Sequence, residues 1–474
     1  MKNVKTDVAI IGAGTAGMAA WHTVNRASLD AILIEGGPYG TTCARVGCMP
    51  SKLLIAAAEA AHGASSASAF GVHIDGALRI DGREVMARVK RERDRFVGFV
   101  LETVDHIPAD QKVRGHARFL SDTSLQVDDH TQIHASRIII ATGTSPNVPE
   151  AYRAIGDRLV INDDIFEWND LPRSVMVVGA GVIGLEIGQA LSRLGVRVCM
   201  INRSGGLGGI TDPDVRASAK AAFEAELDLR LETSVVDMKR VGDAVDVCFQ
   251  TAGKAPVTER FDYVLMAAGR HPNLSRLDLH TTSAHLDDKG MPQYDASTLQ
   301  VGTTPIFIAG DVNGVLPVLH EASDDGRIAA RGAVSYPDVQ RTTRRAPMAV
   351  VFSDPQLAQA GIRYKDLPPG NVVFGEVDFS NQGRARVMLK NKGKLRVYAR
   401  EADGRFLGAE MAGPGMEHIA HLLAWAAQQK MTVGQMLDMP FYHPVVEEGL
   451  RTALRQAAAE VAHTPVPEPV VNSL

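Results

Sequence analysis

The chain has 474 residues, which is too many for a single hydrophobic core and predicts about three or four domains. Its formal net charge is −5 and no block of like charges stands out, so we expect neither a nucleic-acid surface nor a polybasic membrane anchor. No apolar run is long enough for a membrane span and no charged-then-apolar leader opens the chain, so we expect a cytoplasmic protein with small-molecule or protein partners.

The first predicted element is a strand that leads into a glycine-rich turn and a helix. Residues 6–17 read TDVAIIGAGTAG, and Gly12, Gly14 and Gly17 have the G-x-G-x-x-G spacing. The first glycine suits the tight turn, the second lets a pyrophosphate approach, and the third allows close helix packing. The next strand, AILIE, ends at Glu35, an acid placed to hold ribose hydroxyls. These residues predict a dinucleotide-binding module.

Two cysteines follow in the stretch GTTCARVGCMPSK, residues 40–52. A disulfide between Cys43 and Cys48 needs Cα atoms about 5.5–6 Å apart, whereas this spacing in a regular helix gives about 8–9 Å. We therefore expect a distorted turn, and we expect Pro50 to bend any helix here. A strained bridge is easily reduced, which favours redox turnover. The alternatives are two ordinary buried thiols or half of a metal site. The other two cysteines stand far apart, so we expect no metal.

Residues 53–104 predict two helices, and residues 112–149 predict strands that end in IIIATGTSPNVP. Thr142 and Gly143 are small residues at the end of this last strand, where the chain can turn close to a bound nucleotide.

The glycine pattern then repeats. Gly179, Gly181 and Gly184 stand in VMVVGAGVIGLEIG with the spacing of the first fingerprint, so we expect a second dinucleotide-binding module. Where the first module has Glu35, the second has Asn202.

The residues at the end of the strand after the second fingerprint indicate which nicotinamide cofactor is preferred. Asn202 removes the repulsion that an acid exerts on a 2′-phosphate and Arg203 offers a cation, so NADP is favoured slightly over NAD. The module closes with DYVLMAAGRHPN, where Gly269 and Arg270 match the tail of the first module. Two dinucleotides suggest electron transfer between a flavin and a nicotinamide.

The last third of the chain adds two further candidates. The strand in TTPIFIAGD ends at Gly310 and Asp311, an acid that could bind a flavin's ribityl hydroxyls. From Met348 the pattern of strands and helices predicts a separate α+β domain. Near its end, in FYHPVVEEG, His443 can pass protons and Glu448 can orient it.

In this order, the motifs resemble the flavoprotein disulfide reductases along essentially the whole chain, and most closely the dihydrolipoamide dehydrogenases. The resemblance implies FAD, a nicotinamide cofactor and an antiparallel homodimer in which His443 serves the disulfide of the other subunit. It implies that Cys48 lies nearest the flavin, that Cys43 exchanges with the substrate, and that Lys52 pairs with Glu186 beside the flavin.

The resemblance also assigns the cofactor sites. It implies FAD contacts from Gly12, Gly14, Gly17, Glu35, Thr42, Lys52, Thr142, Gly143, Gly310 and Asp311. It implies NAD(P) contacts from Gly179, Gly181, Gly184, Glu186, Asn202, Arg203, Gly269 and Arg270.

The expected fold is α/β, with two Rossmann-like modules and a C-terminal α+β dimerisation domain. We expect an FAD-binding domain in residues 1–149, an NAD(P)-binding domain in 150–272, a central segment that completes the FAD domain in 273–345, and the dimerisation domain in 346–474.

The expected activity is an FAD-dependent dithiol/disulfide oxidoreductase, and specifically a dihydrolipoamide dehydrogenase acting on a small-molecule or lipoyl-protein substrate. The alternatives are an NADPH-dependent reductase of another small disulfide, such as a glutathione-like one, and a redox-sensing binding subunit. Four departures from the family pattern bear on the substrate: Thr41 replaces a glycine, Arg45 an asparagine, Val445 a threonine and Glu447 a serine.

Overall fold

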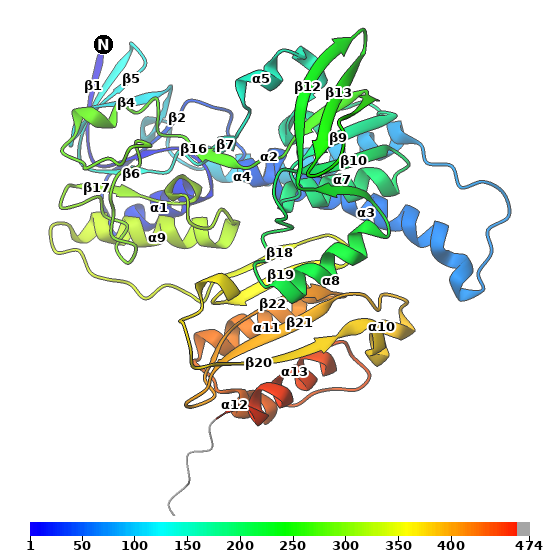
Figure 1. The fold of residues 1–474 in the computed structure, drawn as a ribbon. Helices are drawn as coiled ribbons and strands as arrows, with labels where there is room; N and C mark the ends of the chain where they lie inside the picture. The colour runs from blue at the N-terminus through cyan, green and yellow to red at the C-terminus, as the bar shows by residue number, and fades with distance from the viewer. Residues whose placement is uncertain (462–474) are drawn as a thin grey trace, which may run out of the picture.

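The computed structural model describes residues 1–461, which form two lobes side by side with a third part beneath both (Figure 1). The described residues thus include all the predicted site residues. Residues 462–474 of the predicted dimerisation domain lie outside them.

The first lobe is built on a mixed sheet in the order β3-β2-β1-β6-β5-β4, with β17 on β6. Strand β1 pairs in parallel with β2 and β6, and the apolar run Val8–Ile11 is almost fully buried, as expected of a strand covered on both faces. The strands are β1 (Lys2–Ile11), β2 (Ala31–Glu35), β3 (Lys112–Arg114), β4 (Ala117–Ser121), β5 (Ser124–Val127), β6 (Thr131–Ile140) and β17 (Ile306–Ile308).

Two helices from distant parts of the chain cover one face of this sheet. Helix α1 (Thr15–Arg26) packs on α9 (Leu319–Ser335), and the contact is so close that a Cβ at Gly326 would lie 2.2 Å from the carbonyl oxygen of Ala16. Because β17 and α9 follow the second lobe in sequence, the chain returns to complete the first.

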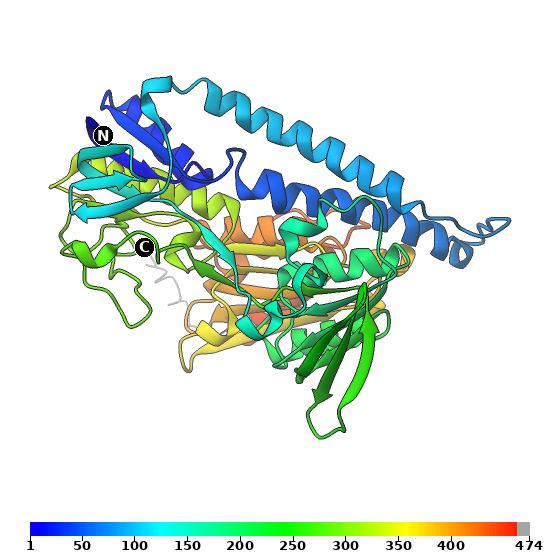
Figure 2. The ribbon, with the colours of Figure 1, turned by 90° about the horizontal axis from the view of Figure 1, so that it is seen from above.

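A long helical hairpin leaves the first lobe and projects past the second (Figure 2). It consists of the short helix α2 (Thr42–Val46), α3 (Cys48–Ser66) and α4 (Gly82–Asp105). The two helices predicted in residues 53–104 are present, and the first of them begins earlier, at Cys48.

The second lobe repeats the parallel βαβ plan. Its main sheet has the order β11-β10-β9-β15-β8, and an antiparallel meander β12-β13-β14 stands beside it. The strands are β8 (Leu159–Val160), β9 (Ser174–Val178), β10 (Arg197–Asn202), β11 (Asp228–Leu231), β12 (Thr233–Val241), β13 (Ala244–Thr251), β14 (Val257–Phe261) and β15 (Tyr263–Met266). The helices are α5 (Glu150–Arg153), α6 (Asn162–Ile165), α7 (Val182–Arg193) and α8 (Pro213–Glu224).

The two lobes are joined by a small antiparallel pair, β7 (Thr144–Pro146) with β16 (Arg270–Pro272). These strands follow the small-residue ends of β6 and β15, so the tails that the sequence aligned with one another pair in space.

The third part is an antiparallel sheet in the order β18-β19-β22-β21-β20, flanked by helices. A Cβ at Gly375 would lie 1.9 Å from the carbonyl oxygen of Ala453, so only glycine lets α13 approach β20 this closely. The strands are β18 (Met348–Val351), β19 (Gln356–Gly361), β20 (Val372–Asp378), β21 (Lys394–Arg400) and β22 (Phe406–Gly413). The helices are α10 (Gly383–Val387), α11 (Met416–Gln428), α12 (Val433–Leu437) and α13 (Glu448–Ala459).

The predicted fold class is confirmed: two Rossmann-like modules and a C-terminal α+β domain. The domain boundaries given above remain predictions. Among residues 1–461, no helix is both long enough and apolar enough to cross a bilayer.

Candidate active site

The first glycine fingerprint divides into two glycines packed against protein backbone and one that faces open space. A Cβ at Gly12, whose φ is +109°, would lie 2.3 Å from the oxygen of Ala141, and one at Gly17 would lie 1.8 Å from the oxygen of Gly12. A Cβ at Gly14 would meet no protein atom within 4 Å. The packing of strand and helix therefore explains the outer glycines, and the open space at Gly14 fits a phosphate at the start of α1.

The second fingerprint has the same division. Added Cβ atoms would lie 2.4 Å from the oxygen of Ala267 at Gly179 and 1.9 Å from the oxygen of Gly179 at Gly184, while Gly181 faces open space. The repeat that the sequence predicted is therefore a repeat of backbone geometry.

Two acids flank the first fingerprint. The Glu35 carboxylate accepts hydrogen bonds from the amides of Ala13 at 2.7 Å and Gly37 at 2.6 Å, which hold it across the glycine turn. Asp311 follows the end of β17 and stands directly after Gly310, whose φ is +81°. Burial raises the pKa of the Asp311 carboxyl, although the Arg270 guanidinium opposes this shift. An open phosphate cradle between two acids that can accept from hydroxyls fits FAD.

The two cysteines lie on either side of a break between helices α2 and α3. The break is at Gly47, where a Cβ would lie 3.0 Å from the oxygen of Thr42 and 3.2 Å from the Cα of Cys43. The expected distorted turn is therefore present. The expectation that Pro50 bends the helix was wrong, because Pro50 lies in the first turn of α3, where a missing N–H costs no intrahelical hydrogen bond.

Cys43 and Cys48 are free thiols in this structure, the first partly buried and the second exposed. The neighbouring Cys43 thiol, helped by the Lys52 ammonium, lowers the pKa of Cys48 to about 7, while the neighbouring Cys48 and burial raise the pKa of Cys43. In the reduced pair, ionisation is therefore favoured at Cys48 over Cys43. A thiolate is the reactive form in disulfide exchange.

Lys52 and Glu186 form an ion pair between the cysteine helix and the second module. The Lys52 ammonium lies 2.9 and 2.8 Å from the two carboxylate oxygens of Glu186, which is 4% exposed. Sequence reasoning missed Phe352, whose amide donates to Glu186 at 3.0 Å and whose ring lies 4.5 Å from the ammonium. Phe352 directly follows β18, and no motif in the sequence marked it.

His443 and Glu448 are brought together as predicted from their spacing. Nδ1 of His443 lies 2.9 and 3.1 Å from the carboxylate oxygens of Glu448, and this hydrogen bond lowers the pKa of Glu448. The His443 side chain is 81% exposed, so Nε2 is free to meet another group. Among residues 1–461 of this chain, its hydrogen-bond and ion-pair contacts are with Glu448 and not with the cysteines.

The departure from glycine at Thr41 has a visible cost. Its backbone has φ 58° and ψ 150°, a region that β-branched residues avoid and that glycine adopts freely. The Thr41 hydroxyl caps α2 by accepting from the amide of Ala44 at 3.3 Å.

The other three residues that differ from the family pattern are Arg45, Val445 and Glu447. The stem of Arg45 packs on Gly40, and its charge acts on Asp163 of α6. The Val445 amide donates to Glu448 at 3.2 Å, and Glu447 precedes the first residue of α13.

The candidates at the lobe junction form one cluster. Thr142 donates through its hydroxyl to the Asn273 carbonyl at 2.8 Å, and Asn273, which sequence reasoning missed, returns a bond to the Thr142 carbonyl at 3.0 Å. Arg270 donates to the hydroxyl and carbonyl of Thr144 at 2.9 and 2.7 Å, and burial lowers its pKa. Gly143 and Gly269 both have positive φ and face open space.

At the end of β10, Asn202 folds the following loop back on itself. Its side-chain amide donates to the carbonyls of Ser204 at 3.1 Å and Gly206 at 2.8 Å. Arg203, next to it, is exposed.

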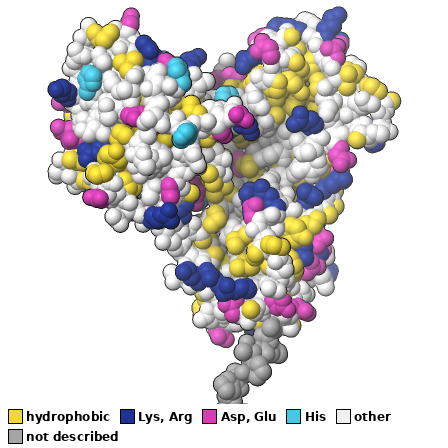
Figure 3. Space-filling model, turned by 60° about the vertical axis from the view of Figure 1, so that its left-hand side comes forward, with side chains coloured by type: hydrophobic (Ala, Val, Ile, Leu, Met, Phe, Trp, Pro, Cys, Tyr) yellow, Lys and Arg dark blue, Asp and Glu magenta, His cyan; other side chains and the backbone are white. Residues whose placement is uncertain are grey.

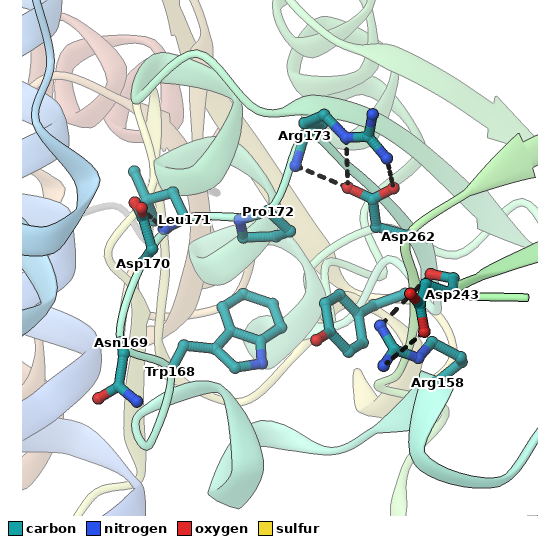
Figure 4. A pocket seen from close by; sticks show the side chains of 10 residues that line it. Arg158, Trp168, Asn169, Asp170, Leu171, Pro172, Arg173, Asp243 and Asp262 are labelled. Atoms are coloured by element: carbon teal, nitrogen blue, oxygen red, sulfur yellow. Dashed lines mark hydrogen bonds and ion pairs between the residues drawn. The ribbon is translucent and has the colours of Figure 1, made fainter.

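A cavity of about 430 Å³ lies apart from these residues, at the edge of the second module (Figure 4). Both of its arginines already pair with acids of the lining: Arg173 binds Asp262 and Arg158 binds Asp243. The surface is also hollowed between the two upper lobes (Figure 3). These two lobes contain the cysteine helices α2 and α3 and the fingerprint helices α1 and α7.

Comparison with known proteins agrees with this arrangement. Residues 6–326 match the family model of pyridine nucleotide-disulphide oxidoreductases, and residues 348–454 match the dimerisation domain of the same family. Dihydrolipoyl dehydrogenase of Bacillus subtilis is 28% identical over 465 residues, covering 96% of this chain and 99% of that one. The enzyme of the same name from Haloferax volcanii is also 28% identical, covering 97% and 98%.

Two solved structures share the fold. LpdA from Mycobacterium tuberculosis has a TM-score of 0.81 at 23% identity, covering 95% of this chain and 99% of that one. The HOCl-induced flavoprotein disulfide reductase RclA from Escherichia coli has a TM-score of 0.78 at 23% identity, with the same coverage. The family matches span most of the chain, and the predicted resemblance is confirmed. The chain belongs to the pyridine nucleotide-disulphide oxidoreductase family, a family of flavoproteins with a redox disulfide.

Proposed function

We propose that this protein is a dihydrolipoamide dehydrogenase that moves two electrons between a dithiol and NAD(P) through Cys43, Cys48 and FAD. The observation that carries the proposal is the pair of cysteines on either side of the helix break at Gly47, with Lys52 of the same helix held by buried Glu186. The shifts that lower the pKa of Cys48 to about 7 and raise the pKa of Cys43 support Cys48 as the thiolate of the reduced pair. Relatives named dihydrolipoyl dehydrogenase support the substrate.

In the proposed reaction, the oxidised enzyme carries a Cys43–Cys48 disulfide. A substrate thiolate attacks the sulfur of Cys43, which forms a mixed disulfide and releases Cys48 as a thiolate. The second substrate thiol loses its proton to an imidazole and attacks its own mixed-disulfide sulfur, which releases Cys43 as a thiolate. The Cys43 thiolate then takes the proton back from the imidazolium. The substrate leaves as a disulfide and the enzyme keeps a thiol and a thiolate, so two electrons have passed to the cysteine pair.

FAD, when bound, supplies the two-electron acceptor between the cysteine pair and NAD(P). Gly14, Glu35 and Asp311 would hold it, with Thr42, Thr142 and Gly143 along its length. Lys52 would place a cation beside its ring, and buried Glu186 fixes that cation in place. Gly181 and Gly269 would contact the nicotinamide dinucleotide, and Arg203 would bind a 2′-phosphate, which favours NADP slightly.

The imidazole is proposed to come from a second copy of the chain in a homodimer. The His443 side chain is exposed and Glu448 orients it, so the imidazole lies on the surface of this domain, where it can meet another subunit. Apolar side chains exposed on the same domain, namely Leu422, Trp425, Met439 and Tyr442, support a subunit interface there. His443 of the partner subunit would then serve Cys43. A cytoplasmic location remains a prediction, in keeping with a pair that must be reduced in each cycle.

The test is steady-state turnover of a panel of disulfides, including lipoamide and oxidised glutathione, each with NADH and NADPH. We expect the highest kcat/KM with lipoamide, and loss of turnover in Cys43→Ser and Cys48→Ser. A thousandfold preference for oxidised glutathione contradicts the substrate and supports a glutathione-like reductase. Absence of any NAD(P)H-dependent disulfide turnover contradicts the enzyme and supports a redox-sensing subunit.

A further inference from the structure

A buried carboxylate of the dimerisation domain reaches into the second lobe. Glu410 in β22 has no exposed surface. Its Oε2 accepts from the amides of Thr211 at 2.6 Å and Asp212 at 2.8 Å. Its Oε1 accepts from the Thr211 hydroxyl at 2.5 Å and the Tyr364 amide at 3.0 Å. Three of these four donors belong to the other domain, so Glu410 ties the two domains together.

The segment held by Glu410 is the end of the loop that follows β10, residues 203–212. The loop begins at Arg203, the cation proposed for a 2′-phosphate, and Asn202 folds its first turn. In its middle, the Gly208 amide donates to the carbonyl of Ala180 at 2.8 Å. Ala180 stands between the first two glycines of the second fingerprint. The loop therefore lies directly against the dinucleotide turn.

The far end of the loop is also rigid. Asp212 has no exposed surface and caps α8 by accepting from the amides of Asp214 at 2.9 Å and Val215 at 3.2 Å. Arg396 and Tyr398 of the dimerisation domain donate to the Asp212 carboxylate at 3.0 and 2.9 Å. Two buried carboxylates persist here because donors satisfy their oxygens.

The dimerisation domain also shapes the middle of the loop. A Cβ at Gly208 would lie 2.2 Å from a methyl carbon of Leu357, a residue of β19. The loop is thus packed between the glycine turn on one side and the third part of the molecule on the other. It has no freedom to shift without breaking one of these contacts.

We propose that Glu410 is a positioning residue for the nicotinamide dinucleotide: it fixes loop 203–212 against the second fingerprint and so sets the place of Arg203. The inference rests on the proposed binding of NAD(P) at that fingerprint. It makes the affinity for the nucleotide depend on a residue in a different domain that does not touch it.

The test is the isosteric variant Glu410→Gln in the FAD-loaded enzyme. A glutamine amide places an NH2 group where one carboxylate oxygen accepted, and either oxygen accepts at least one backbone N–H. At least one backbone N–H therefore faces the NH2 group instead of an acceptor, which weakens the attachment of the loop end to β22. Isothermal titration with NADP⁺ and with NAD⁺ measures binding directly, and steady-state kinetics give KM and kcat.

We expect the Kd of the better-bound nucleotide and its KM to rise about tenfold, with kcat within about twofold of the unchanged protein. Asp403→Asn is the matched control, because Asp403 pairs with Arg400 at the end of β21 on the same sheet, and neither residue bonds to the loop or to Glu410. The control should keep the Kd of the wild-type protein.

Thr211→Val is the second variant, for the case that Glu410→Gln does not fold. It removes the hydroxyl bond to Glu410 and the bond that the hydroxyl accepts from the Lys365 amide at 3.2 Å, and it should raise the Kd about threefold. If wild-type protein binds neither nucleotide, the proposed function and this inference both fail. If wild-type protein binds and both loop variants keep its Kd, or lose thermal stability alone, Glu410 is merely structural and this inference is overturned.

Discussion

Thr41 permits a sharp test of backbone strain beside the redox cysteines. Its φ of 58° with ψ of 150° places a β-branched residue in a region that costs about 1–3 kcal/mol. A Cβ carries most of this cost, so Thr41→Ala keeps about 1–2 kcal/mol of it and also loses the cap to Ala44, worth about 1 kcal/mol. Thr41→Gly removes the strain and loses only a few tenths of a kcal/mol for the cap.

Glycine also gains freedom in the unfolded chain, which costs about 0.5–1 kcal/mol. Summed, Thr41→Gly should leave stability near the wild-type value, and Thr41→Ala should lower it by about 1 kcal/mol. Glycine should therefore exceed alanine by about 1 kcal/mol, which is the reverse of their order at an ordinary position.

The assay is thermal unfolding of the three proteins side by side, with FAD bound. A difference of 1 kcal/mol corresponds to about 2–4 °C in Tm for a cooperative unit of 150–250 residues. Thr41→Ser, which keeps the hydroxyl, serves as the control for the cap. If the alanine variant is as stable as the glycine variant or more so, the backbone at this position is not strained and the reasoning is refuted.

Three further predictions follow from the site. Gly181→Ala should keep the wild-type Tm but weaken NAD(P) binding in titration at least tenfold, since its Cβ meets only the space proposed for the pyrophosphate. Gly179→Ala should lower the Tm, because its Cβ would lie 2.4 Å from the oxygen of Ala267. Equal effects of the two variants on Tm and on binding contradict the different roles given to these glycines. In the reduced enzyme, the Cys48 thiolate should form with a midpoint near pH 7, so its long-wavelength absorbance should fade as the pH falls. Cys43→Ala should move this midpoint to higher pH, because it removes the main cause of the lowered Cys48 pKa. An unchanged midpoint in the variant contradicts this cause. Glu448→Gln should lower kcat with lipoamide by about a hundredfold at neutral pH, because the His443 imidazole loses its anionic partner. A kcat within twofold of wild type contradicts a catalytic role for the His443–Glu448 pair.

Much of this molecule could be predicted from local sequence, because its motifs depend on short spacings. The glycine fingerprints fix a strand, a turn and a helix within a dozen residues, so their packing follows from the pattern itself. The pairing of His443 with Glu448 is similarly local, since a residue just before a helix lies over its first turn. The distorted turn at the cysteines followed from the reach of a disulfide.

Other contacts depend on how separate domains meet, and short-range patterns carry no record of that. Phe352, Asn273 and Glu410 each bind residues far away in sequence, and none stands in a motif that the spacing could identify. Pro50 shows the opposite error: the sequence indicated a helix breaker, but the break fell three residues earlier at Gly47. Whether proline bends a helix depends on where the helix begins.

The central claim, that Cys48 delivers electrons to FAD, is tested most directly by anaerobic two-electron reduction of the purified flavoprotein while its absorbance spectrum is recorded. Wild-type protein should develop a long-wavelength charge-transfer band, which requires a thiolate against the bound flavin, and Cys48→Ser should not. Cys43→Ser, which leaves the Cys48 sulfur in place, should still show the band. A band of wild-type intensity in Cys48→Ser would contradict the assignment.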